Sequence, residues 1–414
     1  MSEHPLLPIE EALARVLAQA KPLPSEPVLL TAAHGRVLAE AAAADLDQPA
    51  FDRGAMDGIA VRAADCAEPG ALLRMLGEAA AGAPFAGTVT AGHCVRIMTG
   101  GVVPTGADAV VPVERLVEEP SQGATRVFRV LDTIRPERHI ARRGSEVRAS
   151  EPVVAAGLRL HGARIGVLAT FGHVTVSVYR KPRVTVLPTG NEIVGISETP
   201  GPGQVRDANR HALTGLLLAA GADVLQGPIA PDRRDALAQT IREALQVSDV
   251  VVLSGGVSAG DYDLVAPALA DLGATAHFHQ IRIKPGKPLL FATLADATGT
   301  KLIFGLPGNP ISAYVCCALF VAPALEALQG RPGVGWQTFA LPSVHALPAV
   351  GPRTELAPAR LVSGSEGTAV ELLPVRGSAD LAHFAEADWW VLRQADAPQA
   401  MPGTLVDVLA WPRP

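Results

Sequence analysis

The sequence has few cysteines and few charged residues, and each scarcity narrows what the chain can be. Its four cysteines, Cys66, Cys94, Cys316 and Cys317, include no Cys-x-x-Cys pair, which argues against a disulfide framework and a structural zinc site. Charged residues make up 18% of the 414 residues and hydrophobic residues 48%, so the chain is too apolar to be disordered. The formal net charge of −6 disfavours a general coating of nucleic acid.

Long hydrophobic runs are also missing. The most apolar stretch, residues 311–325, covers about 15 residues and contains Pro323, whereas a membrane-spanning helix needs about 20. It predicts a buried helix. Glu10, Glu11 and Arg15 interrupt what would be the apolar core of a signal peptide. These features predict a soluble cytoplasmic protein with no membrane partner.

Hydrophobic periodicity divides the chain into segments of different character. An amphipathic helix is predicted over residues 9–20, and short Val, Leu and Ile runs between turns up to about residue 150 are typical of a β-rich module. From Lys181 onward, apolar strands alternate with helical patterns, which predicts a doubly wound, mostly parallel α/β sheet. Pro and Gly at 331–335 mark a linker before a small C-terminal β domain.

The α/β region can be divided into individual elements. Strands are expected at 183–187, 223–226, 249–253 and 301–304, with a further strand pair around 285–287. Helices are expected at 208–220, 233–245 and 264–272, and a long helix is expected to begin at Pro310.

Three glycine-containing loops follow these strands: 187–192 (LPTGNE), 253–263 (LSGGVSAGDYD) and 304–310 (FGLPGNP). Ligands of open parallel sheets bind beyond the C-terminal strand ends, where backbone N–H groups can donate hydrogen bonds to an anion. Asn309 suits a helix N-cap and Pro310 the first helical position, so the positive helix end would face a phosphate. Any one loop could be an ordinary strand-to-helix turn, but three together favour a phosphate-bearing ligand. The candidate ligand-binding residues are Thr189, Gly190, Ser254, Gly255, Gly256, Ser258, Pro307, Gly308, Asn309 and Pro310.

Lysine is scarce outside one short turn. The chain has five lysines against thirty arginines, and Lys284 and Lys287 lie three residues apart in the segment 283–288 (IKPGKP). A compact ammonium group suits a tetrahedral oxyanion or a phosphate. An ordinary solvated turn is the alternative, but the scarcity of lysine elsewhere favours anion binding. A second basic run, at 134–148, is either a solvated surface or faces a phosphate or an acidic partner.

Carboxylates near these segments could hold Mg²⁺, which prefers oxygen ligands. The candidates are Asp57, Glu192, Asp232, Asp261 and Asp263. Asp232 taken alone is expected to be a surface residue. His277 and His279 share one face of a strand and are not expected to be ligands. The sequence has no Walker-type Gly-Lys-Ser/Thr loop, so P-loop ATPase chemistry is poorly supported.

Two N-terminal segments carry a family resemblance. Residues 49–61 (PAFDRGAMDGIAV) and 97–111 (IMTGGVVPTGADAVV) closely resemble signatures of the MoeA/gephyrin E-domain family, the molybdopterin molybdenumtransferases. The TGNE, SGGVS, KPGKP and PGNP segments match in the expected order, so the resemblance covers nearly the whole chain. The related molybdopterin adenylyltransferases, with their MoaB/MogA-like fold, share the Gly-Gly and PGNP loops but lack the Met-Asp-Gly segment.

The resemblance implies insertion of molybdate into adenylylated molybdopterin with release of AMP, assisted by Mg²⁺. It also implies a homodimer whose site lies between the α/β domain of one subunit and the N-terminal domains of the other. Other cofactor-biosynthesis proteins are further expected partners. The expected domains are a discontinuous N-terminal domain (1–50 and 140–178), an inserted β-rich domain (51–139), an α/β molybdopterin-binding domain (179–330) and a C-terminal β domain (331–414).

The resemblance also assigns roles to individual residues. The expected catalytic residues are Asp57, Thr99, Glu192, Asp232, Asp263, Lys284 and Lys287, and the expected metal ligands are Asp57, Glu192, Asp261 and Asp263. Pro307 and Pro310 are expected to shape the last loop. This chain departs from the family at Ser145-Glu146, where Glu-Asp is usual, and at Ile59, where an aromatic residue is usual.

We expect electrostatic catalysis by positioned cations and backbone donors, without a covalent protein nucleophile. Two other functions remain open. One is the adenylylation step itself, which would use Mg-ATP and release pyrophosphate. The other is a pterin carrier or scaffold that binds the ligand without turnover. Molybdate and tungstate are tetrahedral oxyanions of like charge, so the sequence does not separate them.

Overall fold

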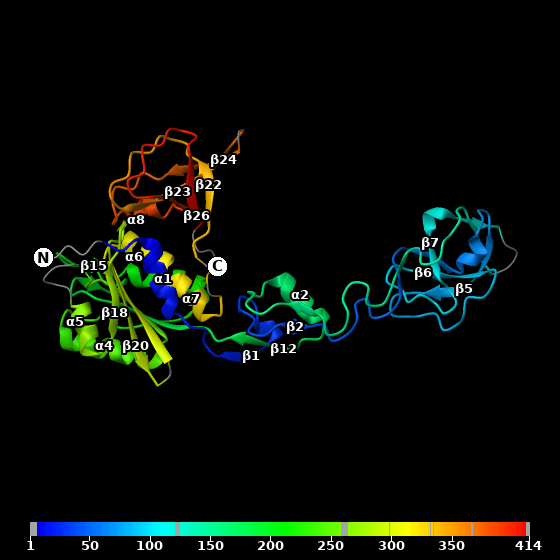
Figure 1. The fold of residues 1–414 in the computed structure, drawn as a ribbon, viewed down its shortest axis with the longest axis horizontal. Helices are drawn as coiled ribbons and strands as arrows, with labels where there is room; N and C mark the ends of the chain where they lie inside the picture. Colours follow the sequence, from blue (N-terminus) through cyan, green and yellow to red (C-terminus); the bar gives the residue numbers. More distant parts are fainter. Residues whose placement is uncertain are drawn as a thin grey trace. The chain divides into compact units, whose positions relative to one another are not determined.

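The computed structural model describes residues 6–410 apart from 121–124, 258–263, 298, 332, 334 and 366. The chain forms two compact units (Figure 1). The larger unit comprises residues 1–40, 157–161 and 176–414, and the smaller unit comprises 41–156 and 162–175.

The larger unit contains a six-stranded sheet with the strand order β16-β13-β17-β21-β20-β18. Its strands in chain order are β13 (Arg183–Pro188), β16 (Asp223–Gln226), β17 (Val250–Ser254), β18 (Thr275–Gln280), β20 (Pro288–Asp296) and β21 (Gly299–Leu306). The pairs β13–β16, β13–β17 and β17–β21 are parallel, and β20 runs antiparallel to both of its neighbours. The mostly parallel sheet predicted from the sequence is confirmed.

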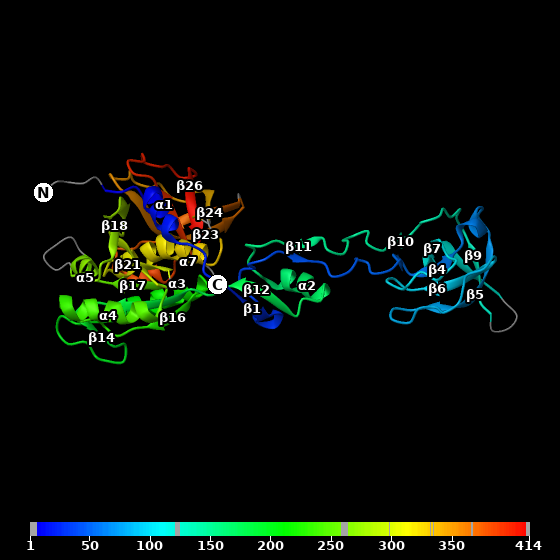
Figure 2. The same cartoon turned by 60° about the horizontal axis from the view of Figure 1, so that its bottom comes forward.

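Helices cover both faces of this sheet, with α4 on one side and α1 and α7 on the other (Figure 2). Val250 and Val252 pack with one group of helices, whereas Val251 and Leu253 pack with the other. The strand is apolar throughout because successive side chains point to opposite faces and both faces are buried. The helices are α1 (Ile9–Gln19), α3 (Asn209–Ala219), α6 (Pro310–Cys316) and α7 (Ala322–Leu328) on the first face, and α4 (Arg234–Val247) and α5 (Val265–Asp271) on the second.

The long apolar helix at Pro310 runs through α6, a π-helical segment (Cys317–Val321) and α7. Residues Pro310–Leu328 are long and apolar enough to cross a membrane by length and composition, but 83% of the most apolar window is buried inside the fold. The buried helix predicted from the sequence is confirmed.

A second sheet in the larger unit has the strand order β19-β23-β25-β26-β22, with β24 paired to β23. Its strands are β19 (Ile283–Lys284), β22 (Thr338–Pro342), β23 (Thr354–Gly364), β24 (Gly367–Leu372), β25 (Trp389–Arg393) and β26 (Leu405–Ala410), and a short helix, α8 (Leu381–Phe384), precedes β25. The small C-terminal β domain predicted from the sequence is therefore present.

The prediction of a strand pair around 285–287 is wrong. The flanking strands β19 and β20 belong to different sheets: β19 pairs with β23, while β20 pairs with β18 and β21. Pro285 has no N–H to donate to a ladder, so the turn leaves one sheet and enters the other.

The smaller unit is built on a six-stranded sheet with the strand order β7-β4-β6-β5-β9-β8. Its strands are β4 (Gly58–Val61), β5 (Leu72–Ala79), β6 (His93–Ile97), β7 (Ala109–Pro112), β8 (Leu116–Glu119) and β9 (Val127–Val130), and the unit also contains α2 (Gly162–Thr170). Ile59, at the position where the family usually has an aromatic residue, is buried in the core of this sheet.

Four further pairs of short strands lie in the described part of the chain. They are β1 (Ser25–Leu29) with β12 (Thr175–Tyr179), β2 (Ala42–Ala43) with β11 (Pro152–Val154), β3 (Arg53–Gly54) with β10 (Ile140–Ala141), and β14 (Ile193–Val194) with β15 (Val205–Arg206).

Gly58 lies where a side chain has no room, which gives a test of this fold. A Cβ at Gly58 would lie 1.9 Å from the Val111 carbonyl oxygen of β7. We expect Gly58→Ala to lower the free energy of unfolding by about 2 kcal/mol or more, because the backbone of a paired strand cannot move aside cheaply.

Gly166 on α2 has nothing within 4 Å of a Cβ built on it and serves as the control. Gly166→Ala should be neutral or stabilising by up to about 1 kcal/mol. Equal effects of the two substitutions in denaturant unfolding would contradict the prediction.

Candidate active site

Asp57 and Thr99 meet in the smaller unit. The Thr99 backbone N–H and hydroxyl both donate to Asp57 Oδ1, at 2.7 and 2.6 Å. The two residues meet because Gly58, next to Asp57, is paired with Ile97, two residues before Thr99. The chain thus brings two of the expected catalytic residues into direct contact.

The Thr99 donors keep Asp57 ionised. The hydroxyl and the backbone N–H of Thr99, with a smaller contribution from Arg96, hold the pKa of the Asp57 carboxyl below its ordinary value of 3.8. Asp57 is exposed, and its Oδ2 makes no hydrogen bond to the part of the chain that the structure describes. An ionised carboxylate with one oxygen available can bind a cation or accept a proton.

Part of the basic run at 134–148 forms ion pairs and hydrogen bonds within its own unit. Arg142 pairs with Asp52 and Glu137, and the Arg143 backbone N–H donates to Asp52 Oδ1 at 2.8 Å. Glu146, where the family usually has Asp, accepts from Arg53 Nη2 at 2.7 Å. These ion pairs join the Phe-Asp-Arg-Gly segment to the Arg-Arg-Gly segment.

Two other arginines of the run have different surroundings. Arg135 and Arg138 line an open cavity of about 480 Å³ together with Thr133. This part of the run remains compatible with an anionic partner.

In the larger unit, the glycine loops surround a cavity of about 690 Å³, called here the glycine-loop cavity. The loop residues that line it are Pro188, Thr189, Glu192 and Ile193 after β13, residues 254–257 after β17, residues 307–310 after β21, and residues 205–209 before and at the start of α3. Ser258, Asp261 and Asp263, which were expected in this site, lie outside the described residues. Of the expected ligand-binding residues that are described, all but Gly190 line this cavity.

Backbone hydrogen bonds join the three loops. The Thr189 N–H donates to Ser254 O at 2.9 Å, and the Gly255 N–H donates to Leu306 O at 3.0 Å. Gly255 has φ +100°, and a Cβ there would lie 2.5 Å from Thr189 O. Only glycine allows both this conformation and this approach, so the double glycine sets the spacing of the loops.

Asn209 joins two of these loops and was missed by the sequence analysis. Its Nδ2 donates to Ser254 Oγ at 2.7 Å and to Gly308 O at 2.8 Å. Because Gly308 O can only accept, these bonds fix which end of the amide faces the loops. Asn209 is the first residue of α3. Its place near the start of the helix expected at 208–220 is its only sequence signal.

The N-terminus of α6 differs from expectation. Asn309 occupies the N-cap position, but its side chain makes no capping hydrogen bond. The Ile311 N–H, one of the donors expected to face a phosphate, donates to Ser378 O at 3.1 Å. Ala379 and Leu381 line the cavity beside it. The segment before α8 therefore forms one wall of the cavity and takes up part of the positive helix end.

Two of the expected acidic residues, Asp232 and Glu192, lie at the loop after β13. The Asn191 N–H donates to Asp232 Oδ2 at 3.0 Å, and the Asp232 N–H donates to Asn191 Oδ1 at 3.3 Å. Asp232 thus joins the loops after β13 and β16, whereas Glu192 itself lines the glycine-loop cavity.

The two lysines of the KPGKP turn have different surroundings. Lys284 Nζ lies 2.9 Å from Glu355 Oε1 on β23. Lys287 lines a separate cavity of about 600 Å³ with Arg282, Arg353, Leu6 and Pro352, called here the cationic cavity. Arg282 also pairs with Asp396. The scarcity of lysine marks Lys284 and Lys287 in the sequence, whereas no local signal marks the two arginines, because the β19–β23 pairing that brings them together is long-range.

The Asp57–Thr99 contact predicts a shift in titration. In Thr99→Val the hydroxyl donor is lost, so the pKa of Asp57 should rise toward its ordinary value, while Thr99→Ser should leave it low. The contribution of these bonds to stability is present above the unfolded pKa and is lost as the pH falls through the lowered folded pKa. Carbon NMR titration of the Asp57 carboxyl measures the shift. An unchanged pKa in Thr99→Val would show that the hydroxyl does not act on Asp57.

Three family models match this chain. The MoeA N-terminal region (domain I and II) matches residues 7–172, a probable molybdopterin binding domain matches 185–327, and the MoeA C-terminal region (domain IV) matches 342–411.

Named relatives agree with these matches. A molybdopterin molybdenumtransferase of Nostoc sp. is 38% identical over 317 residues, which is 76% of this chain and 71% of the relative. One of Haemophilus influenzae is 34% identical over 327 residues, covering 79% of this chain and 78% of the relative. The crystal structure of a molybdopterin biosynthesis MoeA protein of Pyrococcus horikoshii superposes with a TM-score of 0.80 at 30% identity, covering 98% of this chain and 99% of that one. The chain belongs to the MoeA family of molybdopterin molybdenumtransferases, an enzyme family of molybdenum cofactor biosynthesis.

Proposed function

We propose that this protein inserts molybdate into adenylylated molybdopterin and releases AMP, with Mg²⁺ assisting. The observation that carries the proposal is the junction between the glycine-loop cavity and the cationic cavity. Lys287 lines the cationic cavity, and the next residue, Pro288, lines the glycine-loop cavity. A phosphate-linked pterin and a tetrahedral oxyanion can therefore bind at adjoining positions.

The two cavities suit different parts of the substrates. The glycine-loop cavity offers backbone and hydroxyl groups, including Thr189, Ser254 and Ser312, which suit phosphate oxygens. The cationic cavity offers Arg282, Lys287 and Arg353, whose charges suit the molybdate dianion. Family membership supports molybdopterin and molybdate as the substrates, and we assign the first to the glycine-loop cavity and the second to the cationic cavity.

Mg²⁺ fits the glycine-loop cavity as an ion held partly by the substrate. Within the described ranges, no group of three or more His, Cys, Asp or Glu residues could hold a metal by itself. Glu192 lines the cavity, and Mg²⁺ in phosphate sites is commonly held by one or two carboxylates, waters and phosphate oxygens. When bound, the ion would neutralise charge on the phosphoanhydride.

Asp57 belongs to the same proposed reaction. We assign it to the site completed by the second subunit of a cytoplasmic homodimer, with the four-domain division given by the family resemblance. Its ionised carboxylate would add to the electrostatic environment of the transferred oxyanion. A cysteine nucleophile is disfavoured, because burial raises the pKa of Cys66 to about 11 and of Cys94 to about 12, and the thiolate is the nucleophilic form.

The proposed reaction has a direct test. The purified chain is incubated with adenylylated molybdopterin, Mg²⁺ and molybdate, and AMP and active cofactor are followed over time. Molybdate-dependent AMP release is expected, and Asp57→Ala should bind the pterin without releasing AMP. Pyrophosphate release from ATP and molybdopterin would instead indicate an adenylyltransferase. Ligand binding without any AMP release would indicate a carrier.

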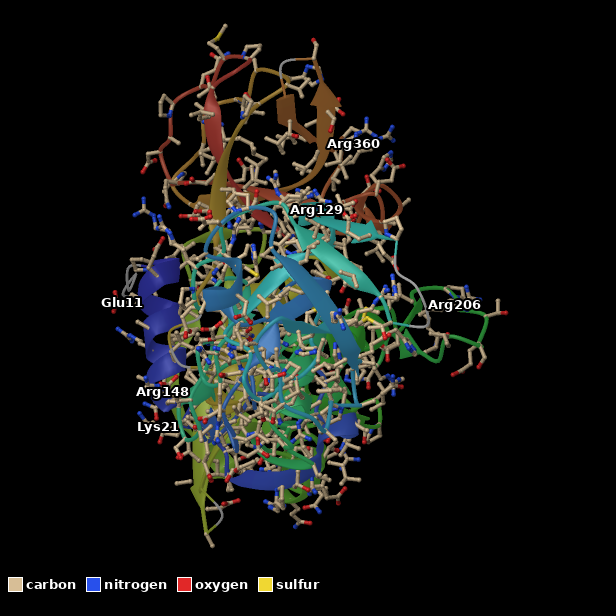
Figure 3. All side chains as sticks on the ribbon, turned by 90° about the vertical axis from the view of Figure 1, so that its right-hand side faces the viewer. Glu11, Lys21, Arg129, Arg148, Arg206 and Arg360 are labelled. Carbon is tan, nitrogen blue, oxygen red and sulfur yellow. The ribbon has the colours of Figure 1, made fainter. Side chains whose placement is uncertain are left out.

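The cationic cavity predicts a residue-specific effect on molybdate. We expect Arg353→Ala to raise the KM for molybdate by about 10-fold or more, because a charge-assisted contact to the oxyanion is lost, while the KM for adenylylated molybdopterin stays unchanged. Arg360 is the matched control: it lies on β23 of the same sheet and pairs with Glu371 (Figure 3). A molybdate KM that is equal in the two variants would remove Arg353 from the site.

A further inference from the structure

The charged residues that line the glycine-loop cavity, within the described part of the chain, are Glu192, Arg206 and Asp207. Asp207 is already neutralised: its Oδ2 accepts from Arg210 Nε at 2.6 Å, its Oδ1 accepts from the Arg210 backbone N–H at 3.0 Å, and its side chain is 1% exposed. Neither lysine of the KPGKP turn lines this cavity. Arg206 is therefore the one cation lining it among these residues.

A two-residue strand pair brings Arg206 to the mouth of the cavity beside Glu192. β14 and β15 are parallel, with Ile193 opposite Val205 and Val194 opposite Arg206. The Val205 N–H donates to Glu192 O at 2.9 Å. Figure 3 shows Arg206 on this loop, which projects from the α/β sheet. Residues that are far apart in the loop thus present a carboxylate and a guanidinium at one opening.

The Arg206 side chain is positioned but has donors left for a ligand. Its Nε donates to Glu198 O at 2.9 Å, which anchors the guanidinium to its own loop. Among the described residues no carboxylate forms an ion pair with Arg206. An anchored guanidinium whose terminal nitrogens face no carboxylate can donate two parallel hydrogen bonds to a phosphate.

We propose that Arg206 is a phosphate-binding residue of the glycine-loop cavity and holds the phosphate of the AMP moiety of the bound ligand. The inference rests on the proposed function and adds to it a specific cation for the nucleotide end. Arg206 supplies the positive charge that the described backbone loops lack, and Glu192, just before the neighbouring strand β14, is the ligand assigned to Mg²⁺. Arg206 thus binds the phosphate in the glycine-loop cavity, whereas Arg282, Lys287 and Arg353 bind the oxyanion in the cationic cavity.

The test is calorimetric titration of the full chain with AMP and with adenosine, which lacks the phosphate. In Arg206→Ala the affinity for AMP should fall by about 10- to 100-fold, as expected for loss of a charge-assisted bidentate contact, while adenosine binding is unchanged. Arg206→Lys should recover part of the loss, since it restores the charge but not the planar fork. Arg242 is the matched control, because it is an exposed arginine on α4 that bonds to Gln239 on its own helix. Arg242→Ala should bind AMP like the wild type.

Three outcomes would overturn the inference: wild-type protein that binds no AMP, unchanged AMP affinity in Arg206→Ala, or an equal loss for AMP and adenosine, which would mark Arg206 as merely structural. The AMP-release assay separates this from failure of the proposed function. Normal AMP release together with unchanged AMP affinity in Arg206→Ala rejects the role of Arg206 alone. The predicted affinity changes without any wild-type AMP release would support the Arg206 contact and reject molybdate insertion.

Discussion

Three parallel strands that lie side by side, β13, β17 and β21, bring their C-terminal ends to one edge of the sheet, and the glycine-loop cavity depends on that adjacency. Neighbouring parallel strands must place their following loops next to one another. Here the loops are joined by backbone hydrogen bonds, Thr189 to Ser254 and Gly255 to Leu306, rather than by side chains alone. The shape of the cavity is therefore a property of the sheet, and side chains such as Asn209 refine it.

The turn after β19 connects this sheet with the C-terminal sheet. Because β19 pairs with β23 and β20 pairs with β21, the lysines lie where the two sheets meet. Backbone donors collect on one side of this turn and cationic side chains on the other. This separation suits a reaction with two anionic substrates, because two anions in a single pocket would repel each other.

The sequence predicted the elements of the larger unit well, because strands buried on both faces are uninterrupted apolar runs and the helices between them have clear periodicity. It failed where the outcome depends on pairing between distant segments. Arg353 joins Lys287 only through β23, and Ser378 reaches the Ile311 N–H from the C-terminal domain. Neither contact leaves a local signal. Glu146 was noted as a departure from the family, but its partner, Arg53, became evident only from the folded chain.

The contacts between the segments near Asp52 and Arg142 have a consequence for modularity. The chain leaves through β3 and returns through β10, which pair with each other, and Asp52–Arg142 and Arg53–Glu146 tie the two crossings together. The segment between β3 and β10 is an insertion whose two ends are held side by side. The contacts at its two ends therefore offset the entropic cost of closing the inserted segment. A short linker that joins β3 directly to β10 would span the same ends, so the rest of the chain can tolerate replacement of the whole insertion.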